Sequence, residues 1–299
     1  MKSPQEPEKR KWLRVSTLTA VRSIPFSAGA GIALLLILVA ILSLFWTPHD
    51  PTKLSVRERL QGPSLEYLLG TDHFGRDIFS MLMVGAQSAV GVGVVAVGIG
   101  MLFGVGLGLV AAAWPSRAGG ILLRGSDLVF AFPPIISAII VTALLGPGAI
   151  NAIIAIGIFN IPVFLRLTRG AAAQIWHREF ILAAQATGKG RLRISLDHIL
   201  PNIAPILVVQ ATIQFALAIL ADAGLSYLGF GVQPPASSWG RMLNEAQSFM
   251  FTNPTLAVWP GLAIALVVLG LNLLGDGLRD LVDPRLARVS SEIGGTLRG

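Results

Sequence analysis

The sequence contains no cysteine, and only 13% of its 299 residues are charged. The lack of cysteine excludes a disulfide, a thiolate metal site and a cysteine nucleophile. The scarcity of charge accompanies 53% hydrophobic residues and a mean hydropathy of +0.70, which is more apolar than the core of a soluble protein requires. The sequence therefore predicts a polytopic membrane protein.

Motifs that would indicate an enzyme are also missing. The four histidines, which are His49, His73, His177 and His198, are scattered and form no cluster with metal-ligand spacing. Gly188-Lys189 is followed by glycine instead of serine or threonine, and Ala183 stands where a Walker A motif has its first glycine. We therefore expect no catalytic residue, no metal site and no nucleotide bound by this chain.

Long apolar runs are present instead. Because a bilayer leaves no backbone polar group unpaired, such runs must be helices, and the period-two alternation of barrel strands is not visible. We predict an all-α protein with six transmembrane helices, at residues 29–46, 88–113, 128–145, 149–167, 203–221 and 256–274. Pro133 and Pro134 are expected to break the third span, and Pro162 to interrupt the fourth.

The basic residues predict how the chain is oriented. Of the 23 Lys and Arg residues, 18 fall on the side of the N-terminus, which the positive-inside rule assigns to the cytoplasm. The predicted order is a cytoplasmic tail (1–28), the first span, an outer loop (47–87), a membrane core (88–275) and a cytoplasmic C-terminal tail (276–299). The core contains a cytoplasmic loop (169–202) and an outer loop (222–255). Nucleic-acid binding is not expected, because no basic groove interleaved with aromatics is present.

Two sets of residues inside the predicted spans have specific interpretations. Gly100, Gly104 and Gly108 recur every four residues, which predicts close helix packing; no Gly-Lys-Ser/Thr follows them, so a phosphate cradle is not indicated. Polar side chains in lipid need partners or a water-lined path, and Asn160, Gln210 and Gln214 are such residues. They either form hydrogen bonds between helices or line a transport path.

Two outer segments are candidate docking surfaces. Residues 69–78 read LGTDHFGRDI, and residues 229–239 are too irregular to form a span. The first segment either docks another protein or is a loop structured by contacts of Asp72, Arg76 and Asp77, and the second either faces another protein or is a structural plug. The candidate docking residues are Asp72, Gly75, Arg76, Asp77, Gln233 and Trp239.

The cytoplasmic loop divides at Gly188-Lys189-Gly190. Alanines before the break favour a helix over 171–187, and a short basic helix from Arg191 to Leu200 is expected to end at Pro201. Two short helices that meet at a glycine suit insertion into the groove of a partner. The alternative is an interfacial helix on anionic lipid.

The run from Glu179 to Pro201 resembles the EAA loop of ABC importer permeases. Ala183, Ala184, Gly188, Leu200 and Pro201 match its pattern, whereas Leu182 replaces its glutamate and His198 its isoleucine. Residues 69–78, 223–243 and 272–284 resemble the same subunits. The likeness covers about residues 20–288 and indicates the C-type subunit of dipeptide, oligopeptide and nickel importers.

This resemblance implies the type I ABC importer permease fold, with six transmembrane helices, in the cytoplasmic (inner) membrane. It implies a heterodimer with a B-type permease, two ATPase subunits that hold ATP and Mg, an extracytoplasmic substrate-binding protein, and a di- or oligopeptide as cargo, all in contact with membrane lipid. Nickel chelates or glutathione are alternative cargoes, and an ion-coupled carrier is disfavoured because no acidic residue lies near the middle of a predicted span. The implied coupling residues are Glu179, Ala183, Ala184, Gly188, Lys189, Arg191, Arg193, Leu200 and Pro201.

Overall fold

A computed structural model describes residues 24–116 and 118–282, and within them the chain is helical with no strand. The long helices are α2 (Ile24–Phe45), α3 (Ile78–Ala113), α6 (Ala149–Trp176), α9 (Leu200–Tyr227) and α11 (Thr255–Val282). The shorter helices are α4 (Ala118–Phe130), α5 (Pro134–Leu145), α7 (Glu179–Ala186), α8 (Arg191–Ile194) and α10 (Trp239–Ala246). Single turns occur at η1 (Val56–Glu58), η2 (Ser195–Ile199) and η3 (Gln247–Phe249).

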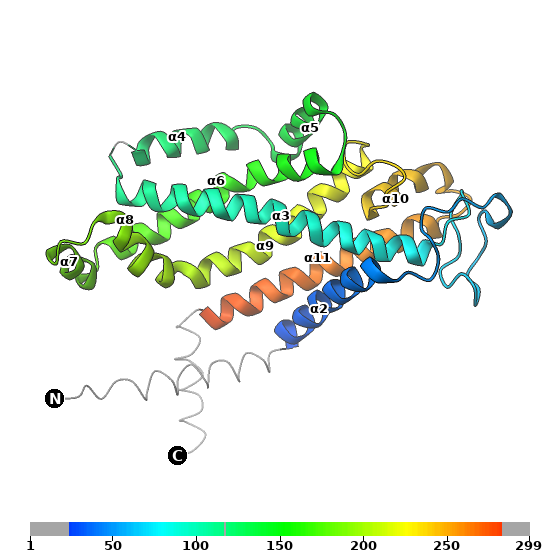
Figure 1. Ribbon diagram of the computed structural model, residues 1–299, viewed down its shortest axis with the longest axis horizontal. Coiled ribbons are helices and arrows are strands. Elements are labelled where there is room, and N and C mark those ends of the chain that lie inside the picture. Colours follow the sequence, from blue (N-terminus) through cyan, green and yellow to red (C-terminus); the bar gives the residue numbers. More distant parts are fainter. Residues whose placement is uncertain (1–23, 117, 283–299) are drawn as a thin grey trace, which may run out of the picture.

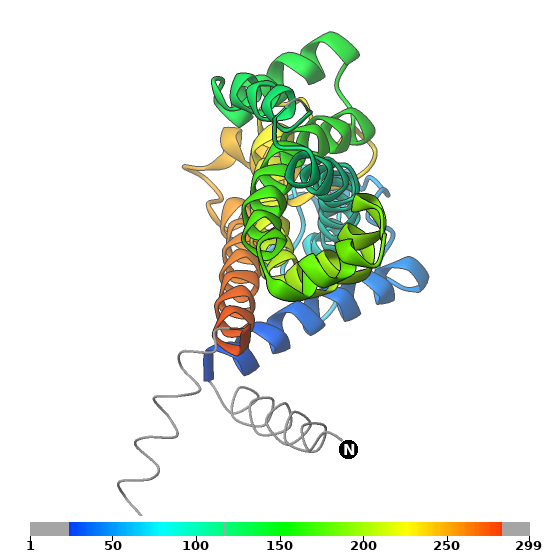
Figure 2. The same cartoon turned by 90° about the vertical axis from the view of Figure 1, so that its left-hand side faces the viewer.

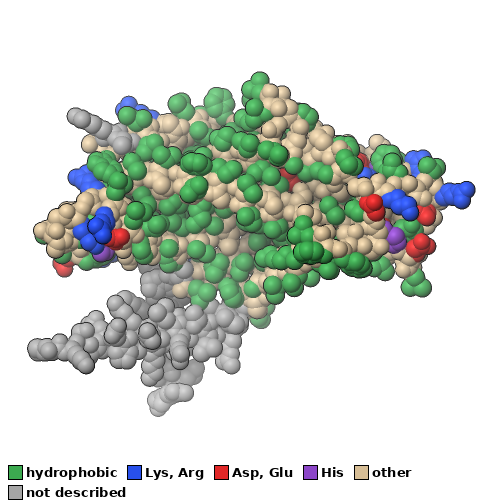
Figure 3. All heavy atoms as spheres, in the orientation of Figure 1, with side chains coloured by type: hydrophobic (Ala, Val, Ile, Leu, Met, Phe, Trp, Pro, Cys, Tyr) green, Lys and Arg blue, Asp and Glu red, His purple; other side chains and the backbone are tan. Residues whose placement is uncertain are grey.

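Five helical segments of the described chain are long and apolar enough to cross a membrane, and there are six when the bent pair α4 and α5 counts as one span. Hydrophobic side chains cover the middle of the molecule, and charged ones gather at its two ends (Figure 3). The prediction of an all-α protein with six spans is confirmed. The third span differs in form, because α4 and α5 meet at an angle of 86°. Pro133 and Pro134 lie at this bend, as expected of residues that cannot continue the helix before them.

The helices extend beyond the predicted spans. The first begins at Ile24 instead of residue 29, and α3 begins at Ile78 instead of residue 88. The two predicted tails lie outside the described residues, apart from 24–28 in α2 and 276–282 in α11. Apolar runs mark the part of a helix that lies in hydrocarbon, whereas hydrogen bonding continues past it. The loop between α2 and α3 therefore spans residues 46–77 and is shorter than the predicted outer loop of residues 47–87.

The predicted end of a helix at Pro201 is wrong. Helical structure continues from Arg191 to Tyr227, through the π-helical turn η2 and into α9. Pro201 directly follows η2, where the Leu200 N–H bonds to the carbonyl oxygen of Ser195 and the α-helical ladder is already interrupted, so its missing N–H group is tolerated. The predicted helix over 171–187 is also divided, because α6 ends at Trp176 and α7 begins at Glu179.

The predicted packing of the glycine series is confirmed. A β-carbon at Gly100 would collide with the side chain of Asn160, and one at Gly104 would lie 2.5 Å from the carbonyl oxygen of Ile161. One at Gly108 would lie 2.6 Å from Cβ of Thr168. These three glycines therefore let the backbones of α3 and α6 approach closely.

The long helices form one elongated bundle (Figure 1). Helix α3 packs on α6 and α9 and also contacts α2, while α11 packs on α2 and α9. Helices α4 and α5 lie outside α6, as the view along the bundle from its α7 end shows (Figure 2). The short helices α7 and α8 occupy one end of the bundle, and α10 with residues 46–77 occupies the other (Figure 1). We call these the α7 end and the α10 end.

Candidate functional site

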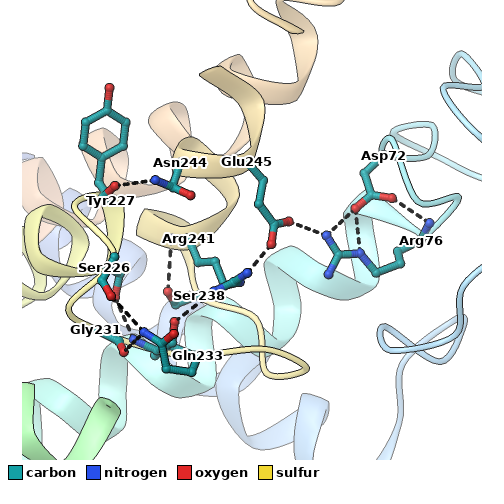
Figure 4. A network of polar contacts seen from close by, with 12 residues as sticks. Asp72, Arg76, Ser226, Tyr227, Gly231, Gln233, Ser238, Arg241, Asn244 and Glu245 are labelled. Atoms are coloured by element: carbon teal, nitrogen blue, oxygen red, sulfur yellow. Dashed lines mark hydrogen bonds and ion pairs between the residues drawn. The ribbon is translucent and has the colours of Figure 1, made fainter. Parts of the chain in front are cut away.

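At the α10 end, Arg76 joins two distant parts of the chain. Its Nε donates to Oδ2 of Asp72 at 2.6 Å, and its Nη2 donates to the carboxylate of Glu245 on α10. Glu245 also pairs with Arg241, at 2.8 Å from Nε to Oε1. Asp72 in turn accepts from the backbone N–H groups of Phe74 and Arg76. Figure 4 shows this chain of contacts leading from the loop to α10.

The same loop fixes the start of α3. The carboxylate of Asp77 accepts from the backbone N–H of Ser80 at 2.9 Å and so caps the helix. Gly75 has φ +78°, and a β-carbon there would collide with the backbone of Ser55. This position therefore requires glycine for both its conformation and its contacts.

Hydrogen bonds also fix the second outer segment, residues 229–239. The indole N–H of Trp239 donates to the carbonyl oxygen of Leu82 at 3.0 Å, and the ring leaves no room for a side chain at Gly85. Gln233 donates to the carbonyl oxygens of Gly229 and Gly231, at 3.0 Å each. These bonds shape the turn between α9 and α10, and Figure 4 shows Gln233 and Gly231 within it.

Five of the six predicted docking residues are therefore buried: Asp72, Gly75, Arg76, Asp77 and Trp239. Gln233 is partly exposed. The five buried residues contact other parts of this chain, including Leu82 on α3 and Glu245 on α10. The surface within reach of another protein consists of neighbours such as Leu65 and Phe251, which are fully exposed.

Asp72, His73 and Glu245 have possible metal-ligand atoms within 4.8 Å of one another. They do not fit a metal site, because Asp72 accepts from Arg76 and Glu245 accepts from Arg76 while pairing with Arg241. Two guanidinium groups already neutralise the two carboxylates, so a divalent cation would face positive charge.

Burial lowers the pKa of His73, since loss of water disfavours the charged ring more than Asp72 and Glu245 favour it. Burial would also lower the pKa of Arg76, but Asp72 and Glu245 outweigh that effect and raise it. The hydrogen bond from Tyr67 to Glu58 raises the pKa of the tyrosine to about 12. The loop thus favours a neutral His73 and a charged Arg76.

In the middle of the bundle, two of the three predicted polar residues meet. Gln214 Nε2 donates to Oδ1 of Asn160 at 2.6 Å, and Asn160 Nδ2 donates to the carbonyl oxygen of Ile156 at 3.2 Å. Both amides are 6% exposed and belong to the wall of a cavity of about 360 Å³ between α5, α6 and α9. The other described residues of the wall are apolar. Gln210 lies one turn away, half-buried, and does not belong to the wall.

At the α7 end, the predicted coupling loop forms a compact element anchored in the core. Ile181 of α7 and Ile194 of α8 are fully buried and join the cluster that α3, α6 and α9 share. Between the two helices, Gly188 has φ +81°, with open space where a side chain would project. Arg191 Nη1 donates to the carbonyl oxygen of Ala113 at 2.7 Å and so ties the element to the last turn of α3.

The predicted coupling residues are largely on the surface of this element. Glu179, Ala183, Gly188, Arg191, Arg193 and Pro201 are exposed, whereas Ala184, Lys189 and Leu200 are partly buried. Lys189 Nζ lies 3.3 Å from Oδ2 of Asp197 and 3.1 Å from Nε2 of His198. Beside them, Phe180 and Leu182 are exposed apolar side chains. Leu182, which departs from the EAA pattern, therefore adds to an apolar surface.

Residues 104–288 match the family of binding-protein-dependent transport system inner membrane components. The chain belongs to this family. The permease is 44% identical to the dipeptide transport system permease protein DppC of Alkalihalophilus pseudofirmus, over 84% of this chain and 82% of that protein. It is 45% identical to the glutathione transport system permease protein GsiD of Escherichia coli, over 86% of each chain.

The permease also resembles a solved structure. The methionine ABC transporter MetNI in inward-facing conformations matches with a TM-score of 0.55 at 20% identity, over 67% of this chain and 96% of that one. This likeness confirms the predicted type I ABC importer permease fold. The permease is thus a multi-pass membrane subunit of an ABC importer.

Sequence reasoning missed two residues of the α10 end, Arg241 and Glu245. They are four residues apart on α10, a spacing that allows an ion pair on one helix face. That signal was available in the sequence. Nothing in the sequence indicated that Glu245 also meets Arg76, because 169 positions separate the two residues.

Proposed function

We propose that this permease carries di- and oligopeptides through the cytoplasmic membrane as one of two paired permeases, with both of its termini in the cytoplasm. The observation that carries the proposal is the exposed α7–α8 element, which has the EAA pattern and is anchored in the membrane core. Relatives named for dipeptide transport support the cargo. The apolar cavity with one amide pair also suits peptides, because it discriminates little among side chains.

The proposal assigns ATP and Mg to two separate ATPase subunits, and this chain binds no cofactor. Exposed Phe180 and Leu182 would enter the ATPase cleft, while Ile181 and Arg191 hold the element to the bundle. An ATPase movement would then reach α3, α6 and α9 directly. Glu179, on the exposed first turn of α7, supplies the carboxylate that Leu182 lacks.

At the α10 end, the proposal places an extracytoplasmic substrate-binding protein on the exposed loop tips around Leu65, Phe251 and Gln233. The buried contacts of Arg76 and Trp239 would act indirectly by holding these tips in place. A B-type permease completes the membrane pore, and the Asn160–Gln214 pair lies on the transport path.

Gly188 provides the test of coupling. In a reconstituted importer, Gly188→Arg should abolish peptide-stimulated ATP hydrolysis while the complex still reaches the membrane. Gly188→Asn is the matched control, because asparagine tolerates φ near +81° better than arginine and is smaller. Stimulation that survives Gly188→Arg at normal levels would remove the coupling role of this loop.

Glutathione is the second candidate cargo, because relatives named for glutathione transport are 40–45% identical to this chain. Uptake of a labelled dipeptide, glutathione and a nickel chelate, each measured with the cognate binding protein, would decide between them. The peptide proposal requires that unlabelled dipeptide compete with dipeptide uptake and that excess glutathione does not.

A further inference from the structure

One arginine of α6 holds the end of α4. Arg166 Nε donates to Oγ of Ser126 at 2.9 Å, and Nη2 donates to the carboxylate of Asp127. The guanidinium group also lies over the ring of Phe130, 4.2 Å from its centroid. Three side chains from the last turns of α4 thus converge on a single residue of α6.

Phe130 has a second contact. Together with Pro134 and Val163, its ring belongs to the wall of the cavity that contains the Asn160–Gln214 pair. Val163 is one turn before Arg166 on α6, and α6 runs toward the α7 end. The stack of Arg166 on Phe130 therefore lies at the end of the cavity that is nearer the coupling element.

Helix α4 ends at a break in the third span. It joins α5 through the 86° bend at Pro133 and Pro134, so the backbone ladder is already interrupted there. Its outward side chains, such as Ile121 and Leu128, are about 70% exposed and add no packing against the bundle. Ser126, Asp127 and Phe130 lie in the last turns of α4, so the contacts of Arg166 hold the end of α4 that adjoins this bend.

We propose that Arg166 positions Phe130 as the inner gate of the transport cavity. While Arg166 holds Ser126, Asp127 and Phe130, the ring closes the cavity toward the cytoplasm. When these contacts break, the Phe130 ring is released and leaves the cavity wall. Arg166 is a positioning residue, since it acts through Phe130. This inference rests on the proposed function, which makes the cavity the transport path.

The gate can be tested by the accessibility of the cavity in the assembled importer. Ala221→Cys places a half-buried thiol on the cavity wall of a chain that has no other cysteine. In inside-out vesicles, a charged thiol reagent added on the cytoplasmic side should modify this thiol slowly. Arg166→Ala should raise the rate by roughly tenfold, the shift expected when a closed state loses its main stabilising contact.

The other variants separate a gate from a general loss of structure. Phe130→Ala should raise the rate as much as Arg166→Ala, and the double variant no further, because both remove the same closure. Arg166→Lys should restore part of the effect, since it keeps a cation near the ring but loses the planar fork. Arg124→Ala is the matched control: this exposed α4 arginine makes no ion pair with the residues that the structure describes, so the rate should stay unchanged.

An unchanged rate in both Arg166→Ala and Phe130→Ala, at wild-type amounts of assembled complex, overturns the gate. If Arg166→Ala does not assemble, Phe130→Ala alone decides, because it keeps the ion pair. Peptide uptake by the Ala221→Cys parent in vesicles of the opposite orientation tests the proposed function separately. Normal uptake with no gating effect would reject the gate and keep the importer.

Discussion

Arg76 lies between two carboxylates, Asp72 on its own loop and Glu245 on α10. Replacing it with leucine leaves both carboxylates buried beside an apolar side chain. Breaking a buried pair in this way costs about 3–5 kcal/mol. We therefore expect Arg76→Leu to lower the thermal unfolding midpoint of the purified importer markedly.

The control for this prediction is Arg57→Gln. Arg57 is exposed on the turn η1 and makes no ion pair with the residues that the structure describes, so its loss should change the midpoint little. Equal effects of the two substitutions would contradict the structural role of Arg76.

His73 makes the stability of the α10 end depend on pH. Burial lowers its pKa below the ordinary value of 6.5, so the unfolded chain takes up a proton more readily than the folded one. Its contribution to stability is complete above pH 6.5 and is lost as the pH falls through the folded pKa. Between pH 7.5 and 5.5, the wild type should therefore lose more thermal stability than His73→Gln.

The comparison concerns the slope with pH and not the absolute stability. The imidazole ring also stacks on Phe249, with centroids 4.9 Å apart, so the substitution lowers stability at every pH. A parallel pH dependence in the two proteins would show that His73 is not the group responsible.

At the scale of helices, the contact between α3 and α6 is sensitive to single methyl groups. Gly104→Leu must push the two backbones apart, because its β-carbon would lie 2.5 Å from the carbonyl oxygen of Ile161. Overpacking of this kind costs about 1–3 kcal/mol. Gly106→Leu, two residues away in open space, is the control on the same helix. We expect Gly104→Leu alone to lower the yield of folded permease in detergent.

Helix-scale features were predictable where they repeat along the sequence. The spacing of Gly100, Gly104 and Gly108 indicated a packing face, and the apolar runs indicated six spans. Local signals failed where context overrides them. Pro201 was expected to end a helix, yet the helical segment continues through it, because the π-helical turn η2 already interrupts the α-helical ladder just before it.

The functional residues were predictable only in part, for the same reason. Asn160 and Gln214 were recognisable as polar residues in spans, but 54 positions separate them, and only the fold shows that they bond to each other. Asp72 and Arg76 were recognised as candidate docking residues. Their burial could not be predicted, because it depends on packing against α10. Arg166 was interpreted only as a cytoplasmic charge. Its partners Ser126 and Asp127 lie on another span, so the sequence did not indicate these contacts.

For the whole molecule, the proposed orientation is open to direct measurement. Phe251→Cys, at a fully exposed tip of the α10 end, should react with an impermeant thiol reagent outside intact cells. Gln185→Cys, exposed on α7, should react only after the membrane is opened. The reverse pattern would invert the proposed topology.

The helical segment from Arg191 to Tyr227 is 37 residues long. At 1.5 Å per residue this is about 55 Å, nearly twice the thickness of the hydrocarbon layer. In the importer proposed above, the surface that would meet the ATPase and the residues that pack against α10 therefore lie at the two ends of one helical segment. Linkage then requires reciprocity: the factor by which nucleotide changes the affinity for a loaded binding protein outside is the factor by which that protein changes the affinity for nucleotide inside.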